Sequence, residues 1–264
     1  MVRKVPEVAV LFWIVKLLTT AMGESTTDYL VFQIDPYVAV VTGFLGLVFS
    51  VLLQLLVHRY IAWTYWLAVV MVAVFGTMAA DVLHVVLGIE YAVSTTFFAA
   101  ALAIVFGVWY ASERTLSIHS IYRGRRELFY WAAVMASFAL GTAAGDLLAS
   151  TLGLGYFASF LVFLVLFALP GFGHWLLGWN PIVAFWCAYV LTRPLGATLA
   201  DWLGKPTLGG LGLGDGRVAV VLALMIIVCV VYLTWQQRVP RISPGAERAD
   251  SPRISPASGP HDAR

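Results

Sequence analysis

The 264-residue chain has little charge and almost no cysteine. Charged residues make up 11% of it, against about 25% in typical soluble domains, whereas apolar residues make up 61%. This composition excludes a soluble globular domain and a disordered chain. The two cysteines, Cys187 and Cys229, lie in apolar stretches, so a disulfide scaffold and a cysteine-based metal site are excluded as well. A polytopic membrane protein is the class that remains.

Apolar runs of about 20 residues, long enough to cross roughly 30 Å of hydrocarbon, account for most of the chain. The eight predicted spans are residues 6–30, 37–57, 62–87, 93–112, 129–151, 156–178, 182–204 and 217–236. Beyond residue 237 the composition changes to Ser, Pro, Arg and Asp, and such a segment cannot bury a core. We therefore predict a disordered cytoplasmic tail over residues 238–264.

The basic residues predict the orientation of the spans, because cytoplasmic loops of membrane proteins are enriched in Lys and Arg. An even number of spans puts both termini on one side, and that side carries twelve of the 16 Lys and Arg residues. The opposite side carries Lys205 and Arg217, while Lys16 and Arg193 lie within spans. We therefore expect both termini in the cytoplasm. Nucleic acid is not expected as a partner, because the basic residues cluster at the ends of spans.

A repeat runs through the four odd-numbered spans. In each, an aromatic residue precedes a tryptophan, a glycine follows ten residues after the tryptophan, and an aspartate follows fifteen residues after it. The tryptophans are Trp13, Trp66, Trp131 and Trp186, the glycines are Gly23, Gly76, Gly141 and Gly196, and the aspartates are Asp28, Asp81, Asp146 and Asp201. Aspartate is rare inside membrane spans, so four copies in one register indicate a true repeat. The repeats cover residues 1–61, 62–128, 129–180 and 181–237, and the second includes a cytoplasmic loop.

This repeat predicts an all-α polytopic membrane protein, with eight transmembrane helices that form four parallel two-helix repeats. Units with an even number of spans are parallel and related by an axis along the membrane normal. We expect a pseudo-fourfold arrangement, with two pseudo-dimeric halves as the alternative. The residues 10 and 14 positions after each tryptophan are small, which is typical of closely packed membrane helices, so the glycines are predicted to pack helices. The tryptophans are expected to anchor the helices at the membrane interface.

Charged residues within the spans predict a cation site. A charge at mid-membrane costs roughly 2.5–3.5 kcal/mol, so these carboxylates need partners or a function. Glu24 and Asp28 share one helix face, where two carboxylates can converge on a proton or a hard divalent cation such as Mg or Mn. The candidate ion-binding or proton-relay residues are Glu24, Asp28, Asp81, Asp146 and Asp201, with Glu24 and Asp28 as the candidate metal ligands. The candidate charge partners are Lys16, Arg193 and His84. A purely structural role for the aspartates stays open, and no cofactor is expected beyond a bound divalent cation.

Five stretches of the chain together form a recognisable pattern. They are Lys4-Val5-Pro6-Glu7-Val8, Phe12-Trp13 with Lys16 and Gly23-Glu24, residues 109–120, residues 141–146 and residues 191–197. Through them the chain resembles a family of bacterial membrane proteins built from four tandem two-span repeats with a characteristic tryptophan, catalogued as a repeat of unknown function. The resemblance covers about residues 4–237. It implies an eight-span protein of the bacterial inner membrane, and it brings no established activity.

The sequence therefore favours a cation transporter or channel-like permease over an enzyme. The expected substrate is a proton, or a divalent metal exchanged for protons, and the expected surroundings are the lipid bilayer. The alternative is a non-transporting membrane scaffold or accessory protein with structural aspartates. A membrane enzyme is less favoured, because the sequence has no nucleophile-and-base constellation and no two-histidine metal motif.

Overall fold

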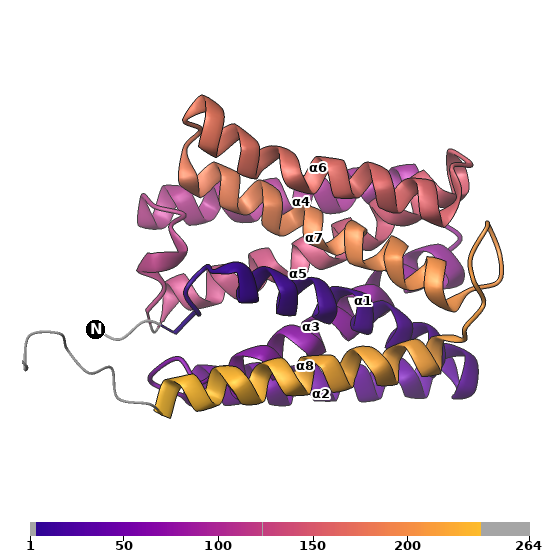
Figure 1. The fold of residues 1–264 in the computed structure, drawn as a ribbon, viewed down its shortest axis with the longest axis horizontal. Helices are drawn as coiled ribbons and strands as arrows, with labels where there is room; N and C mark the ends of the chain where they lie inside the picture. The colour runs from indigo at the N-terminus through magenta and orange to yellow at the C-terminus, as the bar shows by residue number, and fades with distance from the viewer. Residues whose placement is uncertain (1–3, 123, 239–264) are drawn as a thin grey trace, which may run out of the picture.

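The computed structural model describes residues 4–122 and 124–238, and within these ranges its regular structure is entirely helical (Figure 1). Apart from Arg238, the predicted disordered tail lies outside the described residues. The eight long helices are α1 (Val10–Gln33), α2 (Pro36–Leu56), α3 (Ala62–Asp81), α4 (Tyr91–Glu113), α5 (Arg125–Asp146), α6 (Gly155–Leu177), α7 (Pro181–Gly204) and α8 (Asp215–Arg238). Short π-helices extend α3 and α5, namely η1 (Val82–Val86) and η3 (Leu147–Thr151), and a 3-10 turn, η2 (Ile118–Ser120), lies between α4 and α5.

Two helices begin at sites that the local sequence explains. The Asp35 side chain accepts hydrogen bonds from two backbone N–H groups of the first turn of α2, and Pro36 follows it. Asn180 and Pro181 repeat this arrangement at the start of α7. A side-chain acceptor followed by proline satisfies free backbone donors and presets the helical φ angle, which explains why these two boundaries match the predicted spans so closely.

Seven of the helices, α2 to α8, are long and apolar enough to cross a membrane, with α3 and α5 counted together with their π-helical extensions. The exception is α1, which carries Lys16, Glu24 and Asp28. It is as long as the others, at 24 residues, and much of it is buried by its neighbours. The described part of the chain therefore has the helices of a membrane protein, and its most polar helix lies inside the bundle.

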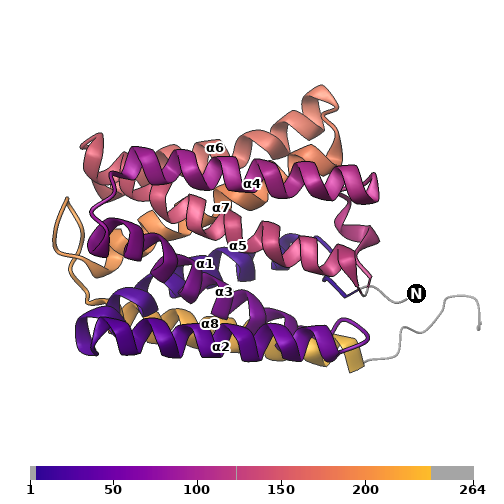
Figure 2. The ribbon, with the colours of Figure 1, turned by 180° about the vertical axis from the view of Figure 1, so that it is seen from behind.

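The odd-numbered helices form the interior of the bundle, and the even-numbered helices cover it (Figures 1 and 2). α1 packs against α3 and α7, and α5 packs against the same two helices, so the inner four close into a ring. Each outer helix packs chiefly on the inner helix of the following repeat: α2 on α3, α4 on α5, α6 on α7, and α8 back on α1. The four repeats therefore interlock in a cycle, which the last helix closes onto the first.

The four repeat glycines lie where neighbouring inner helices cross. Each lies against the residue that stands seven positions after the tryptophan in the next repeat. The contacts are Gly23 with Ala73, Gly76 with Phe138, Gly141 with Arg193, and Gly196 with Thr20. A methyl group on Gly76 would lie only 2.8 Å from Cβ of Phe138, so the helices approach this closely only because the position is glycine. The same contact is made four times around the ring.

The repeat tryptophans lie near the starts of the inner helices, but they do not form a lipid-facing belt. Trp66, Trp131 and Trp186 are buried, and Trp13 is partly buried. Each packs against the aromatic residue that precedes it, and Trp186 also packs against Tyr189. The Trp186 indole donates a hydrogen bond to the backbone oxygen of Leu116, 2.9 Å away, in the loop after α4. The expected interface anchors are thus core residues, because each tryptophan lies on nearly the same helix face as the buried residues seven and eleven positions after it.

Replacement of Gly196 by alanine tests the close crossing of α1 and α7. The added methyl would overlap the Thr20 side chain and lie 2.9 Å from the backbone nitrogen of Ala21, so the two helices must separate. We expect Gly196→Ala to lower the free energy of unfolding by about 1–3 kcal/mol, which thermal denaturation in detergent will show as a lower midpoint. The matched control is Gly107→Ala on α4, where nothing lies within 4 Å, and this change should be neutral or slightly stabilising. Equal losses in both variants would contradict the crossing.

Candidate cation site

Three sets of equivalent positions fill the interior of the ring. They lie three, seven and eleven residues after each tryptophan. The first set is Lys16, Val69, Val134 and Tyr189, the second is Thr20, Ala73, Phe138 and Arg193, and the third is Glu24, Thr77, Thr142 and Ala197. All twelve residues are buried. The middle of the ring is therefore occupied by side chains, and the polar ones differ from repeat to repeat.

Arg193 connects α7 to the three other inner helices. Its Nη1 donates to the backbone oxygen of Thr20 on α1 at 2.9 Å. Its Nη2 lies 2.5 Å from Oε2 of Glu24 on α1 and 2.7 Å from Oγ1 of Thr142 on α5, and it also contacts the hydroxyl of Thr77 on α3. Because Nη2 carries two hydrogens, these three acceptors share them. The guanidinium is thus a hub on which all four inner helices meet.

The ion pair between Arg193 and Glu24 joins α7 to α1, so the charge partner of Arg193 is on another helix and is not Asp201 of its own helix. Both side chains are at most 3% exposed. Thr77 and Thr142 are further partners of Arg193 that are not among the residues predicted from the sequence. The signal was present, because both stand at the repeat position that Glu24 occupies in α1. Glu24, Thr77 and Thr142 meet at the Arg193 guanidinium only because the four inner helices close into a ring.

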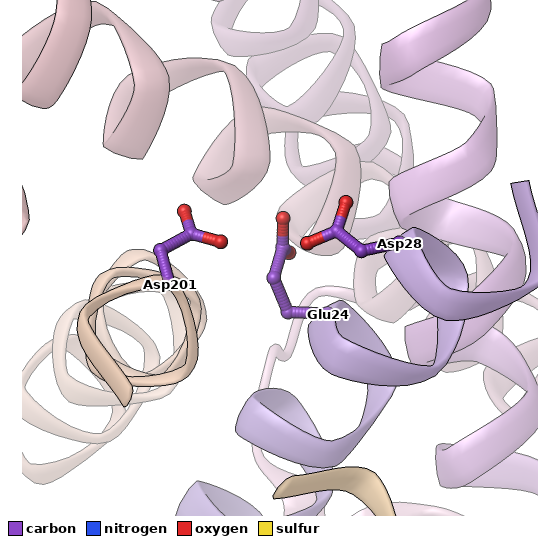
Figure 3. Close-up of side chains that lie close together, drawn as sticks. All are labelled: Glu24, Asp28 and Asp201. Carbon is purple, nitrogen blue, oxygen red and sulfur yellow. The ribbon is translucent and has the colours of Figure 1, made fainter. Parts of the chain in front are cut away.

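Three carboxylates converge in the later halves of α1 and α7 (Figure 3). Glu24 and Asp28 extend from successive turns of α1, and Asp201 extends toward them from α7. One oxygen from each lies within 4.8 Å of the others. Glu24 and Asp201 are buried, while Asp28 is partly exposed. Two of the repeat aspartates and the extra carboxylate of the first repeat therefore share one location.

Lys205, the residue after α7, lies against this carboxylate group. Its Nζ is 2.7 Å from Oδ1 of Asp201 and 3.0 Å from Oδ2 of Asp28, which are ion-pair distances without aligned hydrogen bonds. Burial lowers the pKa of the Lys205 ammonium, but the carboxylates of Asp201, Asp28 and Glu24 raise it by more, so the pKa stands well above its usual value. Lys205 is therefore charged. The sequence places Lys205 on the outer side without a partner, and its spacing of four residues from Asp201 is the signal that could have identified this contact.

Asp81 and Asp146 do not join the three converging carboxylates. They are the last residues of α3 and α5, and a π-helix begins directly after each. π-Helical turns are rare and are frequent at functional sites, and here the same distortion follows the same aspartate in two repeats. The four aspartates thus fall into two classes, a converging pair and a pair at helix distortions.

Two expected charge partners have other contacts. Both ring nitrogens of His84 are engaged, Nδ1 with the backbone oxygen of Ile89 at 3.0 Å and Nε2 with Oγ of Ser94 at 3.2 Å, so this residue is not the partner of Asp81. Lys16 does not pair with Glu24 or Asp28 either. Eight residues along a helix correspond to about 12 Å, and the Lys16 amine instead lies over the rings of Phe138 and Tyr189.

The fold and the site together define a class: an all-helical membrane protein of four interlocked repeats with a polar interior. The family model described as Repeat of Unknown Function (DUF347) matches residues 11–60, 64–115, 129–177 and 184–239, once in each repeat. The chain belongs to this family, and the resemblance noted in the sequence is confirmed. Neither the curated proteins nor the solved structures contain a match to this chain.

Replacement of Arg193 by glutamine tests its role as the hub of the ring. The change leaves the buried Glu24 carboxylate without its cation, and we expect the free energy of unfolding to fall by about 3–5 kcal/mol. Adding Glu24→Gln to Arg193→Gln should recover part of this loss, because no stranded charge remains. Unfolding in micelles of increasing SDS fraction measures both.

The control for that experiment is Arg126→Gln, which breaks the more exposed pair of Arg126 with Glu113, 2.7 Å apart. This change should cost at most about 1 kcal/mol. If the double variant were no more stable than Arg193→Gln alone, the ion pair with Glu24 would not be the important contact of Arg193.

Proposed function

We propose that this protein is a cation transporter of the bacterial inner membrane, with eight spans and both termini in the cytoplasm. Its substrate is a small hard cation: a proton, or a divalent metal such as Mn or Mg exchanged for protons. The observation that supports this function best is the convergence of Glu24, Asp28 and Asp201. Carboxylate oxygens are the ligands that such cations prefer, and water completes the coordination of Mg and similar ions.

The balance of charge supports a bound cation. Three carboxylates share two cationic partners, Arg193 and Lys205, so the fully ionised group keeps one net negative charge. A structural set of carboxylates needs one partner each, because an uncompensated charge in the membrane is costly. A small cation would supply the missing charge.

The filled interior favours a transporter that opens alternately to the two sides over an open channel. Arg193 and the aromatic residues near the helix starts close the ring between the carboxylates and the side of the termini. Under the orientation expected from the basic residues, the carboxylates face the outer side. The Arg193 contacts then form the closed gate of this conformation, and passage of a cation requires them to separate.

A non-transporting scaffold is the second candidate, and one observation favours it. The Arg193 hub ties all four inner helices together, as a purely structural core would. Under this function the carboxylates serve only to pair Arg193 and Lys205. The two candidates therefore differ in whether the protein moves cations at all.

Removal of one carboxylate from the group tests transport. In liposomes that contain the purified protein and a metal-sensitive dye, Asp28→Asn and Asp201→Asn should each reduce Mn²⁺ influx by about tenfold or more, because each removes a ligand. The matched control is Glu90→Gln, an exposed carboxylate at the start of α4 whose side chain makes no capping hydrogen bond. Its influx should equal that of the unmodified protein.

The outcome distinguishes the two candidate functions. Wild-type protein that is folded and moves neither Mn²⁺, Mg²⁺ nor protons would reject transport and favour the scaffold. Flux that persists in Asp28→Asn, Asp201→Asn and Glu24→Gln would reject this site.

Removal of the neighbouring ammonium should have the opposite effect on binding. Lys205→Gln takes away a positive charge within 3.0 Å of two of the carboxylates, so the affinity for Mn²⁺ should rise by about tenfold. Isothermal titration of the detergent-solubilised protein with Mn²⁺ measures this change. The control is Arg217→Gln, which removes a positive charge from the first turn of α8. This change should leave the affinity for Mn²⁺ nearly unchanged. Lower affinity in Lys205→Gln would show that Lys205 supports the bound cation.

A further inference from the structure

Lys16 is a buried amine without a hydrogen-bond acceptor. It lies in the second turn of α1 and is 1% exposed, and within the described residues its Nζ has no hydrogen-bond partner. The other two lysines of the chain differ from it in this respect. Lys4 pairs with Glu127 at 2.5 Å, and Lys205 pairs with Asp28 and Asp201. Lys16 alone among the three has no carboxylate beside it in the described structure.

The surroundings of Lys16 favour the neutral amine over the ammonium. Its Nζ lies 3.8 Å from the ring centroid of Phe138 and 4.1 Å from that of Tyr189. Attraction of an ammonium to aromatic rings is smaller than the cost of burying a charge without a counter-ion. The guanidinium of Arg193 also lies 5.6 Å from the same Phe138 ring, so a charged Lys16 would place a second cation beside the first.

The titratable groups on the neighbouring helices offer Lys16 no compensating anion. On α7 they are Tyr189 and Arg193, and Arg193 already holds Glu24. α3 has no titratable residue between Tyr65 and Asp81, and α5 has none between Tyr130 and Asp146. α8 offers only Cys229 between Arg217 and Tyr232, and α2 has none after Tyr37. A neutral amine with a free lone pair therefore lies between the aromatic residues and the Arg193 hub.

We infer that Lys16 binds the proton that this transporter exchanges for its cation. The inference rests on the proposed function and assigns its coupling to one residue. The neutral amine takes up one proton on its lone pair when the carboxylates have released the cation, and the ammonium returns that proton when the next cation binds. The one positive charge of the ammonium thus replaces part of the charge that leaves with the divalent cation. Glu24 and Arg193 connect the carboxylate group with Lys16. Glu24 belongs to the carboxylate group and pairs with Arg193, and Arg193 lies against the same Phe138 ring as Lys16.

The first test is direct, because the chain contains only three lysines. Protein labelled with ¹⁵N at the lysine side chains and held in lipid nanodiscs should give three NMR signals. At neutral pH and without Mn²⁺, two should have the shift of an ammonium and one that of a neutral amine. Lys16→Met should remove the neutral signal, while Lys4→Arg and Lys205→Arg should each remove an ammonium signal. Three ammonium signals in the wild type would overturn the inference without any transport measurement.

The second test measures coupling in liposomes with a pH-sensitive and a metal-sensitive dye. An imposed Mn²⁺ gradient should drive proton counterflow in the wild type. Lys16→Met cannot bind the proton and Lys16→Arg cannot release it, so both should lose the counterflow, with Mn²⁺ affinity at the carboxylates retained. Proton counterflow that persists in both variants alongside Mn²⁺ flux would overturn the role of Lys16. Absence of Mn²⁺ and proton flux in the wild type would overturn the proposed function and the coupling with it, whatever the NMR signals show.

Discussion

The guanidinium of Arg193 is the group on which the rest of the structure depends. A buried guanidinium is stable only when its charge is paired and its donors find acceptors. Glu24 provides the opposite charge, and two threonine hydroxyls and a backbone oxygen provide the other acceptors. These groups come from the three other inner helices, so one side chain fixes where all four meet. The carboxylates on one side of it and the unpaired Lys16 on the other are both defined by this contact.

The repeats share a plan for packing their backbones but not a set of interior side chains. All four make the same glycine crossing with the next repeat, which gives the ring its cyclic order. At the residue that each glycine meets, however, the four copies carry Thr20, Ala73, Phe138 and Arg193. The four repeats therefore share one backbone framework, but only two of them supply the converging carboxylates. That site lies where the first repeat meets the last, since Glu24 and Asp28 belong to α1 and Asp201 to α7.

Much of the fold could be predicted from particular residues. The starts of α2 and α7 follow from Asp35-Pro36 and Asn180-Pro181, because a cap and a proline act within one helical turn. The helix crossings follow from the glycines. The roles of the tryptophans and of His84 could not be predicted in the same way. Whether an aromatic residue near a helix start faces lipid or the core, and whether a histidine bonds an aspartate or a loop, depends on the neighbouring elements.

The sequence by itself determined that the chain is helical, apolar and built from four copies of one unit, because these properties follow from composition and from helical periodicity along the chain. It also placed five carboxylates and two cations within the spans. The tertiary structure decided which of them meet: Glu24, Asp28 and Asp201 converge, Arg193 pairs with Glu24, and Lys16 has no acceptor among the described residues. The physical reason is that these contacts join residues from different repeats. They depend on the cyclic order of the inner helices and on the packing of each outer helix over the following repeat. The periodicity of a single helix predicts neither of these.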